Sequence, residues 1–242
     1  MKLLLISNSF GVNLQTYAFD IAKANDCELI IYTLYIGGCS LDIHEKNIKE
    51  ENKSYELFIN GKTTNKFVSI NEALHLEKFD YISLQQASHF SGDVSTYYPY
   101  IEFVYNFVKK ERPDAKIIFH KTWAYSGFNT FKYDTVTCIN PDFKFKDDIE
   151  MKRGIDEACR QISKDFHFDK IIGSGDVVEK ASKELCDVYD QQGFHMNSYG
   201  CYLIGCNLIK TLFNMNIKNV FVPQEFGKAT CQRFVDFINK NF

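Results

Sequence analysis

The 242-residue sequence lacks any apolar run long enough to cross a bilayer, since a spanning helix needs about 20 consecutive apolar residues. It has only 4 prolines and 13 glycines, which excludes a collagen-like or low-complexity chain. It also lacks an excess of positive charge, because 28 Lys and Arg stand against 31 Asp and Glu, a formal net charge of −3. This balance argues against a protein that binds nucleic acid or an anionic membrane surface.

The eight cysteines form no Cys-x-x-Cys pair, so the sequence predicts neither a thioredoxin motif nor a zinc knuckle. The histidines and cysteines show no metal-ligand spacing, and we expect neither a metal nor a cofactor. The stretch Met1–Ser9 has about four successive apolar residues, whereas a signal peptide needs roughly 7–15. We therefore expect a cytoplasmic protein whose thiols are reduced.

Strand-like and helix-like segments alternate along the chain. Short apolar or β-branched runs predict strands, and helical spacing of apolar residues predicts helices. Strands separated by helices imply parallel strands with right-handed crossovers. We therefore predict an α/β fold, a three-layer α/β/α sandwich with a parallel, flavodoxin-like sheet, in a single domain over residues 1–242. The predicted strands are 2–6, 28–36, 80–84, 116–120 and 170–172, and the predicted helices are 12–24, 95–111, 149–166, 177–188, 198–214 and 230–239.

A β-hairpin interrupts this alternation at about 55–70. Two strand-like runs flank Asn60-Gly61, a pair that tolerates the positive φ angles of a type I′ turn. We expect the hairpin to be an insertion whose polar tip could overhang the site as a cap.

The first predicted strand ends in a turn that places a serine at the start of a helix. Ligands of parallel sheets bind at the carboxyl ends of the strands, and Asn8-Ser9-Phe10 follow the first of them. The free N–H groups and the dipole of a helix N-terminus stabilise a developing oxyanion. The alternative is that Asn8 or Ser9 only caps the helix.

A serine needs a base to attack an ester at neutral pH, and a histidine near the other end of the chain could supply it. His195 lies in the segment Gly193-Phe194-His195, just before the last long helix. Alone, a histidine in a loop is more often a surface residue.

Together these segments resemble the SGNH (GDSL-type) hydrolases, whose first block carries the nucleophile and whose last block carries the histidine. Gly37-Gly38 after the second strand resembles the second block, and the segments 35–41 and 83–88 are similar to a subgroup of mostly uncharacterised bacterial proteins. The resemblance implies that Ser9 is the nucleophile and His195 the general base. It also implies that the backbone N–H groups of Ser9 and Gly38, with Gly37 as second choice, bind the oxyanion.

The sequence departs from the family in its third block, where an asparagine usually donates to the oxyanion. Gln85-Gln86 stand there instead, and a glutamine amide can donate the same hydrogen bond, so we expect Gln86 in the oxyanion hole. The alternative is that both glutamines only hold the loop backbone. A smaller departure is Ser7, where the family usually has glycine.

The most serious departure concerns the acid that orients the histidine. The family's acid lies three residues before the histidine, where this sequence has Gln192. Loss of such an acid can lower the rate by about 10⁴-fold. Asp190 could reach His195 if the loop bulges, or a backbone carbonyl could serve. A Ser–His dyad and an inactive protein are the remaining alternatives.

The resemblance and the residues together predict a serine esterase acting on a small or carbohydrate-linked acetyl ester. The Gly-x-Ser-x-Gly elbow of the α/β-hydrolases is absent. Alternatives are a degenerate relative that binds a glycan or small ligand, and a flavodoxin-like nucleotide-binding domain that holds phosphate at 7–11. We expect the ester as partner, no nucleic acid or membrane, and room for a homodimer. The expected substrate contacts are Asn8, Phe10, Gly37, Gln85, Trp123 and Tyr125.

Overall fold

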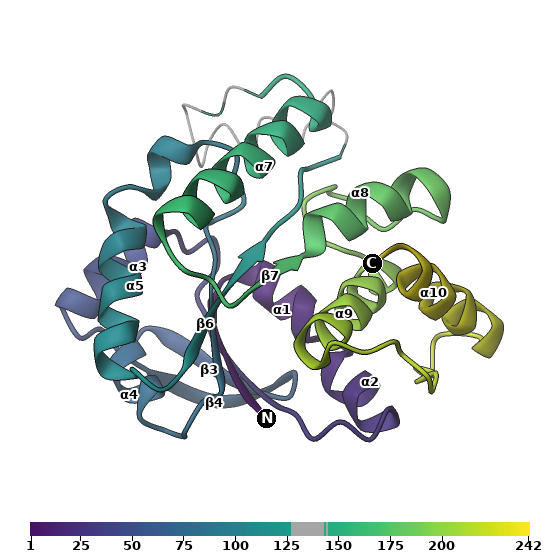
Figure 1. Cartoon of the computed structure of the whole chain (residues 1–242), viewed down its shortest axis with the longest axis horizontal. Coiled ribbons are helices and arrows are strands. Elements are labelled where there is room, and N and C mark those ends of the chain that lie inside the picture. The colour runs from purple at the N-terminus through teal and green to yellow at the C-terminus, as the bar shows by residue number, and fades with distance from the viewer. Residues whose placement is uncertain (127–142, 144) are drawn as a thin grey trace.

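A central sheet of seven strands organises the chain, in the order β4-β3-β2-β1-β5-β6-β7. The computed structural model describes residues 1–126, 143 and 145–242 (Figure 1). A strand occurs at each predicted place, because each of these apolar runs is short enough to be buried as a strand. The strands are β1 (Lys2–Ser7), β2 (Ile30–Tyr35), β3 (Tyr55–Ile59), β4 (Lys62–Val68), β5 (Tyr81–Leu84), β6 (Lys116–Lys121) and β7 (Lys170–Gly173).

Helices cover both faces of the sheet, which confirms the predicted three-layer sandwich. In Figure 1, α3, α4, α5 and α7 lie on one face, and α1, α2, α8, α9 and α10 lie on the other. Among the described residues, no helix is both long and apolar enough to span a membrane. The helices are α1 (Ser9–Gln15), α2 (Ala18–Ala24), α3 (Leu41–Lys49), α4 (Ile70–Leu74), the 3-10 helix η1 (Val94–Tyr97), α5 (Tyr100–Glu111), α7 (Asp148–Asp165), α8 (Ser174–Glu184), α9 (Ser198–Phe213) and α10 (Lys228–Asn241).

Strand β1 explains why the core has two halves. It lies between β2 and β5 and pairs with both in parallel. Because neighbouring side chains of a strand point to opposite faces, Leu3 and Leu5 enter the core under α9, whereas Leu4 and Ile6 enter the core under α5. A strand buried on both faces needs a continuous apolar run, which is the pattern that predicted it.

The hairpin forms at the predicted turn but does not cap the site. Asn60 and Gly61 have φ angles of 50° and 78°, as a type I′ turn requires. Strand β3 pairs antiparallel with β2, and the N–H of Asn60 donates to the carbonyl of Ile31 near the amino end of β2. The tip therefore lies at the edge opposite the carboxyl ends, and the hairpin extends the sheet. The expected overhang is wrong.

Several helices differ from their predicted extents for local reasons. The predicted helix at 12–24 divides at Thr16 and Tyr17 into α1 and α2. The predicted helix at 95–111 is η1 followed by α5, because Pro99 has no N–H to continue a helix from the turn before it. Helix α8 begins at Ser174 rather than Val177. The short helices α3 and α4 were not predicted.

Two histidines are almost completely buried in the two halves of the fold. The hydroxyl of Tyr55 lies 2.9 Å from Nδ1 of His44, which is 1% exposed. His120 in β6 is also 1% exposed. Burial disfavours the charged imidazolium, and it lowers the pKa of His44 to about 4 and that of His120 to about 3.

These two histidines should make the protein less stable in mild acid. An unfolded histidine titrates near 6.5, so between about pH 6.5 and 4 the unfolded chain binds protons that the folded chain excludes. The free energy of unfolding should therefore decrease as the pH is lowered through this window, by about 1.4 kcal/mol per pH unit for each buried histidine. Urea unfolding at pH 6.5 and pH 5 measures it.

Comparison of variants isolates this effect from the titration of the carboxyl groups. His44→Leu should lose about one histidine's share of the pH slope, whereas replacing the exposed His75 by Gln should leave the slope unchanged. Equal slopes for the wild type and His44→Leu would contradict the assignment.

Candidate active site

Ser9 is the first residue of α1, directly after β1. The preceding Asn8 has extended backbone geometry, and its side-chain oxygen accepts a hydrogen bond from the N–H of Phe10 at 3.0 Å. This N-cap is what the alternative interpretation of Asn8 predicted, and it leaves the Ser9 hydroxyl free for other partners. Ser9 is half-buried, at the carboxyl edge of the sheet.

His195 and Ser9 meet although 186 positions separate them. The Nε2 atom of His195 lies 2.8 Å from the hydroxyl oxygen of Ser9. The histidine is held by a turn just before α9, in which Tyr189 and Met196 form a single antiparallel bridge. The N–H of Met196 also donates to the side chain of Asn13 on α1, at 3.3 Å. The serine helix and the histidine turn are therefore joined directly.

Asp190 is the carboxylate that faces the other side of the imidazole ring. Its Oδ2 atom lies 3.7 Å from Nδ1 of His195, and its Oδ1 atom accepts a 2.7 Å hydrogen bond from the N–H of Gly193. The N–H of Asp190 donates to the carbonyl of His195, so the turn folds back on itself. Gln192 lies at the exposed tip of this turn. The bulged loop considered for Asp190 is the arrangement present.

The glycine pair after β2 forms an exposed turn beside this site. Gly38 has a φ angle of +64°, which a residue with a side chain rarely adopts. The side-chain nitrogen of Asn8 donates to the carbonyl of Cys39 at 3.0 Å and fixes this turn to the start of α1. Within the described part of the chain, the N–H groups of Ser9 and Gly38 donate to no other group.

Gln86 does not take the expected place in the oxyanion hole. Its side-chain oxygen accepts from the N–H groups of Leu41 and Ala87, and its nitrogen donates to Thr96. Both polar atoms of the Gln86 side chain are therefore hydrogen-bonded to the surrounding loop backbone. This is the alternative, that the glutamine only holds the loop, which the sequence left open. The expected substrate contact of Gln85 is also wrong, since its amide bonds Asn8 and His120 and is 2% exposed.

The aromatic residues expected to bind substrate are mostly buried. Phe10 stacks on Trp123 with ring centroids 4.0 Å apart, and these side chains are 2% and 0% exposed. The indole N–H of Trp123 donates to the carbonyl of Phe194, next to His195. Tyr125 is 6% exposed, and its hydroxyl bonds that of Ser88. These rings lie beneath the site, and burial leaves Phe10 and Trp123 almost no surface for the expected contact with substrate.

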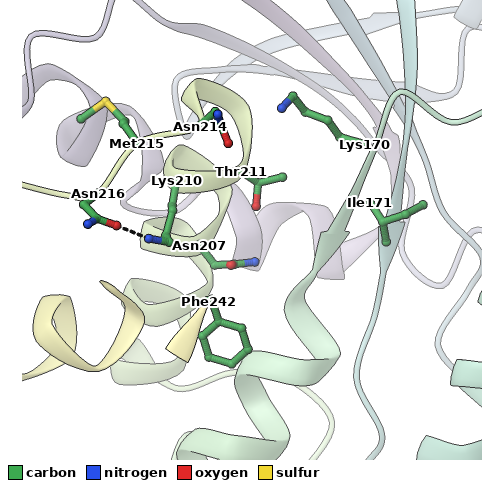
Figure 2. Close-up of a pocket in the computed structure, with 9 residues that line it drawn as sticks. All are labelled: Lys170, Ile171, Asn207, Lys210, Thr211, Asn214, Met215, Asn216 and Phe242. Atoms are coloured by element: carbon green, nitrogen blue, oxygen red, sulfur yellow. Dashed lines mark hydrogen bonds between the residues drawn. The ribbon is translucent and has the colours of Figure 1, made fainter. Parts of the chain in front are cut away.

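A pocket of about 540 Å³ lies away from this site, at the amino edge of the sheet (Figure 2). It is lined by Lys170 at the start of β7, by residues of the last turns of α9, including Lys210, and by Asn214, the C-cap of α9. Ser9 and His195 lie near the opposite end of α9, whose first residue is Ser198. This pocket therefore contributes nothing to the chemistry of Ser9.

Solved hydrolase structures share this fold. A member of the lipolytic protein G-D-S-L family from Veillonella parvula DSM 2008 has a TM-score of 0.54 and 12% identity, over 89% of this chain and 100% of that one. A carbohydrate esterase family 3 structure from Talaromyces cellulolyticus has a TM-score of 0.54 and 11% identity, over 88% and 97%. At such identities the likeness concerns the fold alone, an α/β sandwich that these hydrolases share with this chain.

The chain belongs to the family described as domain of unknown function DUF4886, whose model matches residues 2–233. It is similar to a DUF4886 family protein from Bacteroides uniformis ATCC 8492, with a TM-score of 0.88 and 26% identity over 99% of this chain and 93% of that one. No curated protein sequence matches it.

The turn that carries Ser9 depends on a fit between Ser7 and Gly11. A Cβ atom added at Gly11 would lie 2.2 Å from the Ser7 hydroxyl oxygen and 2.5 Å from its Cβ. The Ser7 hydroxyl donates to the carbonyl of Leu34, so it has little freedom to move away. Gly11→Ala should therefore destabilise the protein by about 1–3 kcal/mol, as overpacking does, despite alanine's better helix propensity.

A double-mutant cycle measured by urea unfolding tests this fit. In the Gly11→Ala background, Ser7→Gly should recover most of the lost free energy of unfolding. In the wild-type background, Ser7→Gly should change the free energy of unfolding much less. Additive effects of the two substitutions would show that they do not share the space.

Proposed function

We propose that this protein is a serine esterase that hydrolyses a small or carbohydrate-linked acetyl ester by acyl transfer. The observation that carries the proposal is the 2.8 Å contact between Nε2 of His195 and the hydroxyl of Ser9. At this distance the imidazole can accept the hydroxyl proton as the serine attacks. Both groups are reached from solvent, since the His195 side chain is 35% exposed and Ser9 is only half-buried.

The reaction would proceed in two acyl-transfer steps. The Ser9 oxygen attacks the ester carbonyl while His195 takes its proton, and the carbonyl oxygen becomes an oxyanion facing the N–H groups of Ser9 and Gly38. His195 then gives the proton to the leaving alcohol as the C–O bond breaks. Water, deprotonated by His195, attacks the acyl-serine; the bond between the acyl carbon and the Ser9 oxygen breaks, His195 returns the proton to that oxygen, and the acid is released. The Asp190 carboxylate stabilises the imidazolium formed in each step.

The carbohydrate esterase among the structural neighbours supports an ester carried by a sugar. Gly37 and Gly38 are exposed beside the serine and have no side chains to occupy the space of an acyl group. The nucleotide-binding alternative has no such support, because the two more distant neighbours reported above are a carbohydrate esterase and a member of a lipolytic protein family.

A second candidate is a relative that binds an ester or glycan without turning it over. It is favoured by one observation, the 3.7 Å separation of Asp190 from Nδ1 of His195, which is longer than a hydrogen bond. The two candidates differ in whether Ser9 forms an acyl intermediate.

Hydrolysis of p-nitrophenyl acetate distinguishes these candidates. Ser9→Ala should lower kcat/KM by about 10³-fold or more, because no nucleophile remains and only the oxyanion donors can act. The exposed Ser182→Ala provides the matched control and should retain the wild-type rate. A slow release of p-nitrophenol that Ser9→Ala does not change would favour the binding protein.

The identity of the acid is tested by comparing Asp190 with Gln192. Asp190→Asn should lower kcat by about 10²–10⁴-fold, because the imidazolium loses its charged partner. Gln192→Ala should stay within about twofold of wild type, because this side chain is exposed at the tip of the turn. If Gln192→Ala lost activity and Asp190→Asn kept it, the assignment of the acid would be reversed.

A further inference from the structure

A chain of buried polar side chains crosses the carboxyl ends of four parallel strands beneath the catalytic serine. Its members are Ser174 after β7, His120 in β6, Gln85 after β5 and Asn8 after β1. Their exposed fractions lie between 0% and 2%. The contacts between successive members are 2.9, 3.0 and 2.8 Å. The chain ends on the residue that precedes Ser9.

The direction of every hydrogen bond in this chain follows from one backbone group. The Asn8 oxygen accepts from the N–H of Phe10, so it must also be the atom that accepts from the Gln85 nitrogen. The Gln85 oxygen then faces Nδ1 of His120, which must carry the ring proton. The unprotonated Nε2 of His120 therefore accepts from the Ser174 hydroxyl.

Burial maintains this arrangement across ordinary pH. It lowers the pKa of His120 to about 3, so the ring stays neutral and keeps a single proton. A second proton on Nε2 would remove the acceptor that the Ser174 hydroxyl uses. The neutral ring with its proton on Nδ1 is therefore the form that fits its neighbours.

Asn8 links this row of hydrogen-bonded side chains to both parts of the reactive site, the start of α1 and the Gly38 turn. Its oxygen holds the first turn of α1 through Phe10, and its nitrogen holds the Gly38 turn through the carbonyl of Cys39. If the Gln85 amide turned over, its oxygen would face the Asn8 oxygen, and two acceptors would lie about 2.8 Å apart. Asn8 would then have to release one of these two contacts.

The Ser174–His120 pair resembles a second catalytic pair but has no access to substrate. Ser174 is 0% exposed, and the other ring nitrogen of His120 is occupied by Gln85. No ester could reach this hydroxyl in the folded protein. The Ser174–His120 pair can therefore affect the reaction only through the residues to which it is hydrogen-bonded.

We propose that His120 is a positioning residue for the esterase reaction, which holds the Ser9 nucleophile and the Gly38 oxyanion turn in register through Gln85 and Asn8. The inference rests on the proposed function. It predicts an effect on kcat rather than on substrate binding, because small displacements of reacting groups lower the rate of the chemical step.

Two replacements of His120 separate positioning from mere packing. His120→Leu fills much of the space but has no donor, whereas His120→Asn is smaller and places an N–H close to the position of Nδ1. With p-nitrophenyl acetate, His120→Leu should lower kcat about 10–100-fold at similar KM, and His120→Asn should recover most of that loss. This order should hold even if His120→Asn has the lower Tm.

A buried hydroxyl outside the chain provides the matched control. The Thr33 hydroxyl in β2 donates to Gln15 at 2.7 Å and is 0% exposed. Thr33→Val removes this bond, so it should lower Tm and leave kcat unchanged. Equal kcat for wild type and His120→Leu, or equal losses for His120→Leu and His120→Asn, would overturn the positioning role.

Amide hydrogen exchange decides the inference independently of turnover. The N–H of Phe10 should exchange faster in His120→Leu, because its acceptor on Asn8 is no longer fixed, and should be unchanged in Thr33→Val. If the wild type showed no Ser9-dependent hydrolysis, the proposed function would fail. Unchanged Phe10 exchange in His120→Leu would instead refute the control of Asn8 by His120.

Discussion

The arrangement of the site depends on the side chain of Asn8, which is 2% exposed and makes three hydrogen bonds. A short amide at this position joins the helix that carries Ser9, the turn that carries Gly38 and the loop after β5. These segments follow three different strands, β1, β2 and β5. A buried amide with all its partners present is rigid, since releasing any one of them leaves an unpaired polar group. The serine is therefore held by the sheet as a whole.

The position of Asp190 shows that the geometry of a turn can bring a carboxylate to a histidine from a position that the family's spacing does not predict. The family's spacing would place the carboxylate at position 192, but the backbone of this turn folds so that Asp190 faces His195 and Gln192 faces solvent. The hydrogen bond from Gly193 to Asp190 and the positive φ of Gly193 close the turn. A sequence pattern records distance along the chain, whereas the ring responds to the charge nearest in space.

The strands and the hairpin turn could be predicted because each depends on local patterns and on one rule of parallel sheets. The pairing of Ser9 with His195 was expected from the resemblance to the SGNH hydrolases. The roles of the glutamines and aromatic rings could not be predicted. Gln86 bonds Leu41 and Thr96, and Trp123 stacks on Phe10, so their roles depend on which neighbours the packing brings together. A type of residue shows what a side chain can do, and burial decides which of those roles remains.

Two serine–histidine pairs of nearly the same geometry in this protein also show that the surroundings of a side chain decide its role. Ser9 lies 2.8 Å from His195, and Ser174 lies 2.9 Å from His120. The first histidine faces a carboxylate and solvent. The second faces an amide in a dry interior where charge is excluded, and its pKa is lowered to about 3. The first pair is therefore suited to proton transfer and the second to fixing a direction of hydrogen bonding.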